Sequence, residues 1–187
     1  MREEIREIVV ATSNEHKLQE IRRILKGFRV EGHEVRVKEN GKTFEANAIK
    51  KVKALRLEPG QIGIADDSGL MVDCLGGSPG VRSARFADPP TPKNLCGKLL
   101  RLMKPCRDRR ARFICAIAIA FPKGSIRVVM GDVNGMISDR MRGQSGFGYD
   151  PVFVPSGYRQ TFAEMPPELK NHLSHRARAL KKLAKII

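Results

Sequence analysis

The segment Phe113–Phe121 constrains the fold most, because it is a short and almost wholly apolar run, Phe-Ile-Cys-Ala-Ile-Ala-Ile-Ala-Phe. Such a run predicts a strand that is buried on both faces in the middle of a sheet. Pro122–Ser125 has the composition of a hairpin turn, and Ile126–Ile137 is expected to return as the next strand.

Strands and helices alternate along the rest of the chain. Glu7–Ala11 is expected as a strand, and Arg29–Lys38 as one strand or a pair of short strands. Apolar residues at helical spacing predict a helix after the first of them and a second helix that Thr43 can cap. Lys93–Met103 and Ser174–Ile187 are further expected helices. This order predicts an α/β fold with a mixed β-sheet.

The composition is that of a folded protein, with 41% hydrophobic and 29% charged residues. Residues 1–187 are expected to form one domain. No segment is long and apolar enough for a membrane span, and Met1–Glu4 lacks the apolar core of a signal peptide, so we expect a cytoplasmic protein with no membrane partner. The cysteines show no zinc-site spacing and are expected as free thiols: Cys74, Cys96, Cys106 and Cys115.

Two adjacent carboxylates, Asp66 and Asp67, follow the apolar residues Ile62, Ile64 and Ala65. We expect a strand that stops at this pair, with another short strand over Met71–Leu75. One interpretation of the pair with the serine and glycine that follow it is an ordinary turn. The other is a site for a divalent cation.

The segment Thr12–Lys17 lies between the first expected strand and the first expected helix. Backbone N–H groups at a helix start attract phosphate, and Lys17 adds a positive charge. The alternative is that Ser13 or Asn14 only caps the helix.

Lys and Arg number 35 against 20 Asp and Glu, a formal charge of +15. This excess indicates a polyanionic partner: nucleic acid, a membrane surface or a phosphorylated small molecule. The alternative is a highly charged surface of the kind found in thermophilic proteins. Aromatic residues are only 5%, few for a protein that stacks on many bases. The chain lacks a P-loop motif and a Gly-x-Gly-x-x-Gly after the first strand, which excludes P-loop and dinucleotide-binding Rossmann proteins. A basic nucleic-acid-binding module remains an alternative.

Polar clusters at the ends of expected elements combine carboxylates, basic side chains and aromatic rings, as a metal-dependent nucleotide hydrolase requires. In their order and residues they resemble the inosine-triphosphate pyrophosphatase family, which hydrolyses non-standard purine nucleoside triphosphates. The segments that carry the resemblance are Ala11–Ile21, Ala65–Leu70, Leu75–Val81, Ser83–Phe86, Gly146–Phe153, Thr161–Met165, Lys170–Asn171, Ser174–Arg176 and Ala179–Leu180.

The resemblance implies an α/β fold with a long mixed β-sheet flanked by helices, two lobes with a cleft between them, a homodimer and Mg²⁺ as cofactor. It implies hydrolysis of ITP, dITP and XTP to the monophosphate and pyrophosphate, with no nucleic acid required. Asp67 would hold the metal and act as the catalytic base, with Asp66 beside it. The substrate-binding residues that it implies are Thr12, Ser13, Asn14, Glu15, His16, Lys17, Lys51, Ser68, Phe147, Gly148, Tyr149, Asp150, Lys170, His175 and Arg176.

The chain departs from the family pattern in the second helix. Members carry a metal-binding Glu directly before the Asn-Ala pair, where this chain has Ala46 before Asn47. Glu45 is one residue early, an offset of about 100° on a helix. Either Glu45 still reaches the cation or the site lacks a ligand, and the second case keeps an inactive nucleotide-binding member as an alternative.

Overall fold

The computed structural model describes residues 7–187, so Met1–Glu4, on which part of the localisation prediction rests, lies outside the described residues. The described strands form one sheet in the order β2-β1-β3-β4-β5-β6. β1 is parallel to both β2 and β3, whereas β5 and β6 are antiparallel. The predicted α/β fold with a mixed sheet is therefore confirmed, and β4, which contains most of the apolar run, lies inside the sheet.

The strands are β1 (Glu7–Ala11), β2 (Arg29–His33), β3 (Gln61–Val72), β4 (Arg110–Ala120), β5 (Ile126–Ile137) and β6 (Phe153–Pro155). The α-helices are α1 (Glu15–Ile24), α2 (Phe44–Lys53), α3 (Pro92–Leu102), α4 (Pro167–Leu173) and α5 (His175–Leu183). Two short 3-10 helices cover Asp73–Leu75 and Gly80–Arg85.

The chain divides into two compact units, and each has its own hydrophobic core. The first unit comprises the described residues up to Asp67, residues 115–131 and residues 176–187. The second comprises residues 68–114 and 132–175. The first core joins apolar residues of β1, β3 and β4 to α1 and α5. The second joins α3 to the residues around β6, including Phe113, Phe153 and Phe162.

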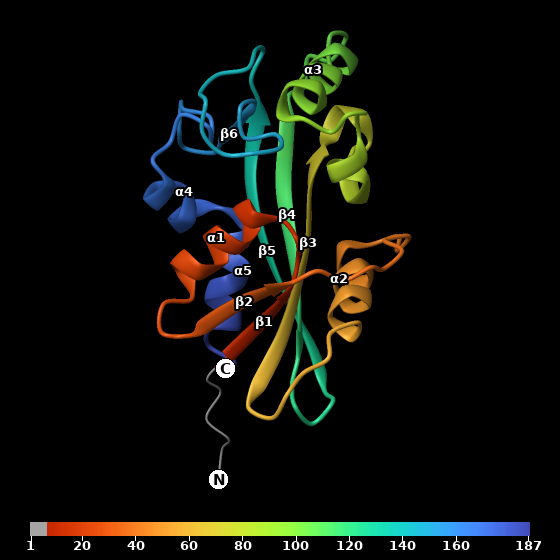
Figure 1. Cartoon of the computed structure of the whole chain (residues 1–187). Helices are drawn as coiled ribbons and strands as arrows, with labels where there is room; N and C mark the ends of the chain where they lie inside the picture. Colours follow the sequence, from red (N-terminus) through yellow and green to blue (C-terminus); the bar gives the residue numbers. More distant parts are fainter. Residues whose placement is uncertain (1–6) are drawn as a thin grey trace. The chain divides into compact units, whose positions relative to one another are not determined.

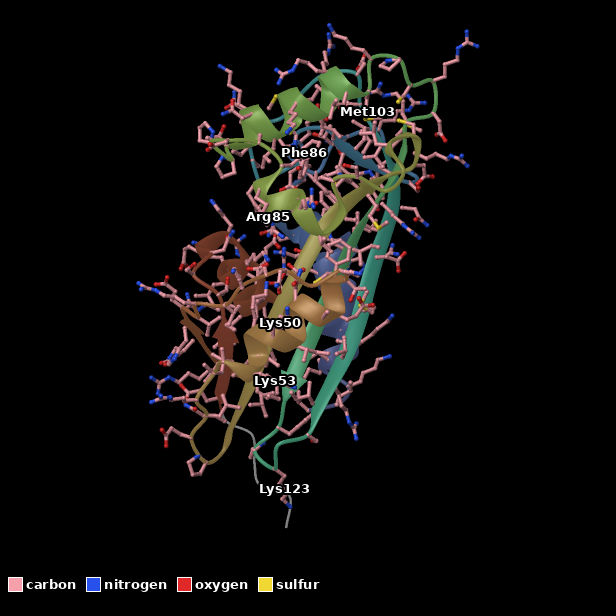
Figure 2. The ribbon with its side chains drawn as sticks, turned by 90° about the vertical axis from the view of Figure 1, so that its right-hand side faces the viewer. Lys50, Lys53, Arg85, Phe86, Met103 and Lys123 are labelled. Atoms are coloured by element: carbon pink, nitrogen blue, oxygen red, sulfur yellow. The ribbon has the colours of Figure 1, made fainter. Side chains whose placement is uncertain are left out.

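Helices cover both faces of the strands in the first unit. Figure 1 shows α1 and α5 on one side of β1 and β3, and α2 on the other. Thr43 caps α2 as predicted, with its hydroxyl accepting from the Ala46 N–H at 3.1 Å. The buried side of α2 carries two polar residues, Asn47 and Lys51, among its apolar ones. Lys50 and Lys53 lie on the exposed side, turned away from the strands (Figure 2).

The prediction of a strand that ends at the aspartates is wrong. β3 continues through Asp66 and Asp67 to Val72, and Asp73–Leu75 form a 3-10 helix where a strand was expected. The strand continues because cationic side chains pair with each aspartate, so no turn is needed to bring the carboxylates into water. Of the range predicted as one strand or a pair of short strands, Arg29–Lys38, the structure has a single short strand, β2, which ends at His33.

Two further predictions from composition can be compared with the structure. All four cysteines are free thiols, as expected. Within residues 7–187, no helix combines the length and the apolar content that a membrane span needs.

Candidate active site

The two aspartates of β3 point to opposite faces of the sheet, because successive side chains of a strand alternate. Asp66 lies on the same face of β3 as Ile62 and Ile64, which pack in the core that α1 and α5 share. Asp67 is on the other face, where its hydrogen-bond partners come from α2. The pair that is adjacent in sequence therefore forms two separate sites.

Asp66 is buried in a cluster of ion pairs. Its Oδ1 lies 3.1 Å from Lys17 Nζ on α1, and its Oδ2 accepts from Arg176 Nη2 at 2.9 Å and Nε at 3.3 Å. Burial alone would raise the pKa of this carboxyl, but the charges of Lys17, Arg176 and Lys51 outweigh it and hold the pKa far below its usual range. Asp66 is thus a permanent anion.

Glu20 is a member of this cluster that the sequence analysis missed. It lies on the buried side of α1 and pairs with Arg176 Nη1. The Arg176 side chain is only 1% exposed, so its guanidinium is enclosed between two carboxylates. A sequence signal was present: Glu20 lies one helical turn before the apolar Ile24, on the side of α1 that faces the core.

Asp67 has a different environment. Its Oδ2 accepts from Asn47 Nδ2 at 3.0 Å, and its Oδ1 lies 3.4 Å from Lys51 Nζ. The same Nζ lies 3.5 Å from Glu39 Oε2. Burial raises the pKa of Asp67 above its ordinary value, even though Lys51 and Asn47 act to lower it. Asp67 therefore holds a proton more strongly than a free aspartate does.

The segment Thr12–Lys17 leads into α1. Asn14 caps the helix by accepting from the Lys17 N–H at 3.1 Å, and the Asn14 N–H donates to Thr12 Oγ1 at 3.1 Å. Residues 13–16 are exposed, whereas Lys17 turns inward to Asp66. The capping interpretation of Asn14 is confirmed, and the N-terminal amides of α1 still offer an attractive field to an anion.

In the second unit, the loop Gly146–Asp150 is organised around the Asp150 carboxylate. Oδ2 accepts from the Phe147 N–H at 2.8 Å and pairs with Lys170 Nζ of α4 at 2.7 Å. The Lys170 ammonium also lies 4.8 Å from the centre of the Phe147 ring. A side chain at Gly146 would collide with Asp150, so only glycine permits this close approach.

The other predicted residues of the second unit are Tyr149, His175 and Ser68. Tyr149 donates its hydroxyl to the Ser83 carbonyl at 2.9 Å, which ties the loop to the 3-10 helix Gly80–Arg85. His175 is buried and stacks on Phe113, with ring centres 4.7 Å apart. Ser68 is half-buried in β3. The structure thus brings predicted residues together at three places: around Asp66 and around Asp67 in the first unit, and around Asp150 in the second.

A family model that describes the Ham1 family matches residues 8–186. The chain belongs to the Ham1 family. It is 45% identical to the dITP/XTP pyrophosphatase of Bacillus licheniformis over 195 residues, covering 98% of both chains. It is 46% identical to the dITP/XTP pyrophosphatase of Desulforamulus reducens, covering 96% of this chain and 94% of that one.

Solved structures of Ham1 proteins share the fold. The Ham1 protein of Staphylococcus aureus superimposes with a TM-score of 0.86 at 37% identity, over 97% of each chain. The HAM1 protein of Coxiella burnetii gives a TM-score of 0.85 at 34% identity, over 97% of this chain and 98% of that one. These findings confirm the family resemblance that the sequence motifs carry.

Whether this Ham1 chain can hold a metal ion depends on the oxygen donors near Asp67. Among residues 7–187, no group of three or more His, Cys, Asp or Glu side chains could hold an ion by itself. Oxygen donors are nevertheless present in Asp67 and the nearby Glu39. Mg²⁺ suits such a site, because it is usually held by one or two carboxylates while phosphate oxygens and water complete its shell.

Proposed function

We propose that the chain hydrolyses non-standard purine nucleoside triphosphates, ITP, dITP and XTP, to the nucleoside monophosphate and pyrophosphate. The observation that carries this proposal is the environment of Asp67, a buried carboxylate with a raised pKa between Asn47 and Lys51. Membership of the Ham1 family supports it, since relatives of similar length are named dITP/XTP pyrophosphatases.

Asp67 is the general base of the proposed reaction. A carboxylate with a raised pKa takes a proton more readily than an ordinary one. It orients a water molecule for in-line attack at the α-phosphorus and accepts its proton. Asp66 stays ionised and keeps Lys17 and Arg176 in place. When bound, Mg²⁺ supplies Lewis-acid polarisation of the phosphate oxygens at Asp67.

Binding of the triphosphate falls to the basic groups of the first unit. Lys17, Lys51 and the N–H groups of Thr12–His16 neutralise the charge that develops on the leaving pyrophosphate. The base is recognised by Phe147–Asp150, Lys170, His175 and Arg176, with Ser68 also on the substrate. A 6-oxo purine offers an acceptor to N–H donors of this group, whereas adenine would leave them unpaired.

We further propose that residues 1–187 work as one catalytic domain, in the cytoplasm and as a homodimer. Nucleoside triphosphates are cytoplasmic substrates, and four free thiols suit a reducing compartment.

The decisive experiment incubates the protein with ITP, dITP, XTP, GTP or ATP and Mg²⁺ in ¹⁸O-labelled water. We expect pyrophosphate from the first three nucleotides, with ¹⁸O in the monophosphate, since attack is at the α-phosphorus. Release of orthophosphate, or ¹⁸O in pyrophosphate, would overturn the mechanism.

The matched variant is Asp67→Asn, which keeps the size of the side chain and removes the base. We expect kcat to fall by about 10²–10⁴, the usual contribution of a general base. No turnover by the unaltered protein would favour an inactive nucleotide-binding member. Strong, salt-sensitive binding to long DNA or RNA without turnover would favour a nucleic-acid-binding protein.

A further inference from the structure

Two of the four free thiols lie next to each other in the second unit. A hydrogen bond joins the side chain of Cys74, in the 3-10 helix Asp73–Leu75, to that of Cys106, in the segment that follows α3. Both side chains are half-buried and pack against the core of that unit. The other two thiols, Cys96 and Cys115, are buried. Cys74 and Cys106 are therefore the pair that a small molecule in solution can reach.

The segments that carry the two thiols meet the same arginine at the start of β4. Arg110 Nε lies 3.8 Å from Oδ2 of Asp73, the residue directly before Cys74. Arg110 Nη2 lies 2.7 Å from Oδ2 of Asp108, two residues after Cys106. These ion pairs are a second observation, separate from the hydrogen bond, that places the two segments side by side.

The surroundings make the two thiols unequal. Burial and the hydrogen bond to Cys106 raise the pKa of Cys74 to about 11. Asp108 also raises this pKa, whereas the charge of Arg109 acts to lower it. A thiolate, not a thiol, attacks a disulfide, so Cys74 is a poor first nucleophile at neutral pH. The first attack on an oxidant therefore falls to Cys106.

We propose that Cys74 and Cys106 form a site of reversible oxidation, at which a small-molecule disulfide converts the two thiols into an intramolecular disulfide. Cys106 attacks the small disulfide as a thiolate, forms a mixed disulfide and releases one small thiolate. Cys74 loses its proton to solvent and attacks the Cys106 sulfur, which releases the second small thiolate. The protein loses two electrons and two protons, and the small disulfide takes them up as two thiols.

The bond closes a loop of roughly 30 residues that contains α3. Figure 1 shows α3 at the end of the sheet where β3 stops and β4 begins. A disulfide stabilises a protein mainly by restricting its unfolded chain. For a loop of this length and a chain of this size, the melting temperature should rise by about 7–15 °C on oxidation. In a reducing compartment the pair stays reduced, and the bond forms when the thiol pool is oxidised.

The test treats the folded, full-length protein with oxidised glutathione and compares it with the protein reduced by dithiothreitol. We expect the thiols counted after denaturation to fall from four to two, and trypsin to release one linked pair of peptides, joined through Cys74 and Cys106. Calorimetry should show the rise of about 7–15 °C in melting temperature, reversed by dithiothreitol.

The variants Cys74→Ser and Cys106→Ser should each abolish the difference in melting temperature between the oxidised and reduced forms. The matched control is Cys115→Ala, which removes a buried thiol outside the pair and should keep the full difference. Because each variant is compared with its own reduced form, a change in its basal stability does not affect the result.

Four thiols after treatment would overturn the proposal, as would a disulfide between two protein molecules or a stable mixed disulfide with glutathione. A linked pair that includes Cys96 or Cys115 would also overturn it. A bond between Cys74 and Cys106 that leaves the melting temperature unchanged would refute the inferred stabilisation. The experiment uses no nucleotide, so its outcome is independent of the proposed function.

Discussion

Replacing Arg176 with Met tests the buried ion-pair cluster of the first unit. Methionine is similar in length to arginine and can fill much of the same space, but it removes the guanidinium that pairs with Asp66 and Glu20. The Asp66 side chain is 2% exposed and that of Glu20 is 11% exposed, so water cannot replace the lost partner. The ion pair between Lys17 and Asp66 remains.

Removing one partner of a buried ion pair costs about 3–5 kcal/mol of folding free energy, because a buried charge is left uncompensated. For a chain of this size, 1 kcal/mol corresponds to a change in melting temperature of about 2–4 °C. We therefore expect Arg176→Met to lower the melting temperature by roughly 6–20 °C.

The effect should also depend on pH. In the unaltered protein the pKa of Asp66 is depressed on folding, so its contribution to stability is present above the unfolded pKa and is lost as pH falls. Without Arg176 the pKa of Asp66 rises, and protonation relieves the unpaired charge. The destabilisation by Arg176→Met should therefore be smaller at pH 4 than at pH 7.

The assay is urea unfolding at pH 4 and pH 7, followed by circular dichroism. Arg178→Met is the matched control, since Arg178 is an exposed residue of the same helix and its replacement should change stability by no more than about 0.5 kcal/mol. Equal destabilisation by the two variants, or the same loss for Arg176→Met at both pH values, would refute the account of Asp66 as a buried, compensated anion.

Three other substitutions test the remaining contacts. Asn47→Ala removes a hydrogen bond that lowers the pKa of Asp67, so the acid limb of the pH–kcat profile should move to higher pH; an unmoved limb would contradict this role. Lys170→Met leaves Asp150 buried without its ammonium and should cost about 3–5 kcal/mol in urea unfolding, with partial recovery when Asp150→Asn is added. Gly41→Ala places a methyl group 2.5 Å from Asn47 Oδ1 and should lower stability by about 1–3 kcal/mol in the same assay; a neutral result would show that the loop adapts.

Local pattern was enough to predict most elements of the fold. Ile126–Ile137 was expected as a strand and coincides with β5, and Thr43 caps α2 as expected. Both features depend on residues that are close together in sequence. The strand follows from the alternation of side chains along the segment, and the cap follows from a hydrogen bond between a side chain and a nearby backbone amide. The family resemblance, carried by motifs along nearly the whole chain, supplied the rest of the fold class.

The course of β3 could not be predicted in the same way. Gly, Asp and Ser in succession are typical of a turn, because each competes locally with regular structure. The groups that keep Asp66 within the strand are Lys17, which lies 49 residues earlier, and Arg176, which lies 110 residues later. Pairs at such separations leave no periodic signal in the sequence.

Polar residues in the apolar stripe of a helix are a further sequence signal, and in α2 they predict a buried partner. The buried side of α2 consists of Phe44, Asn47, Ala48, Lys51 and Val52, the spacing expected of one helix face. Asn and Lys at such positions are rarely buried unless they are paired. Their presence in an apolar stripe therefore predicts a buried anion opposite, and the structure places Asp67 there.

The alternation of β3 also explains how two neighbouring carboxylates can have different chemistry. Asp66 faces the side on which Lys17 and Arg176 converge, and these charges outweigh its burial and lower its pKa. Asp67 faces α2, where burial outweighs Lys51 and Asn47 and its pKa is raised. Opposite pKa shifts in a neighbouring pair separate a permanent anion from a proton acceptor. Because a one-residue slip of β3 would exchange the faces, the register between β1 and β3, with Val10 opposite Ile64, determines which aspartate faces α2 and acts as the base in the proposed mechanism.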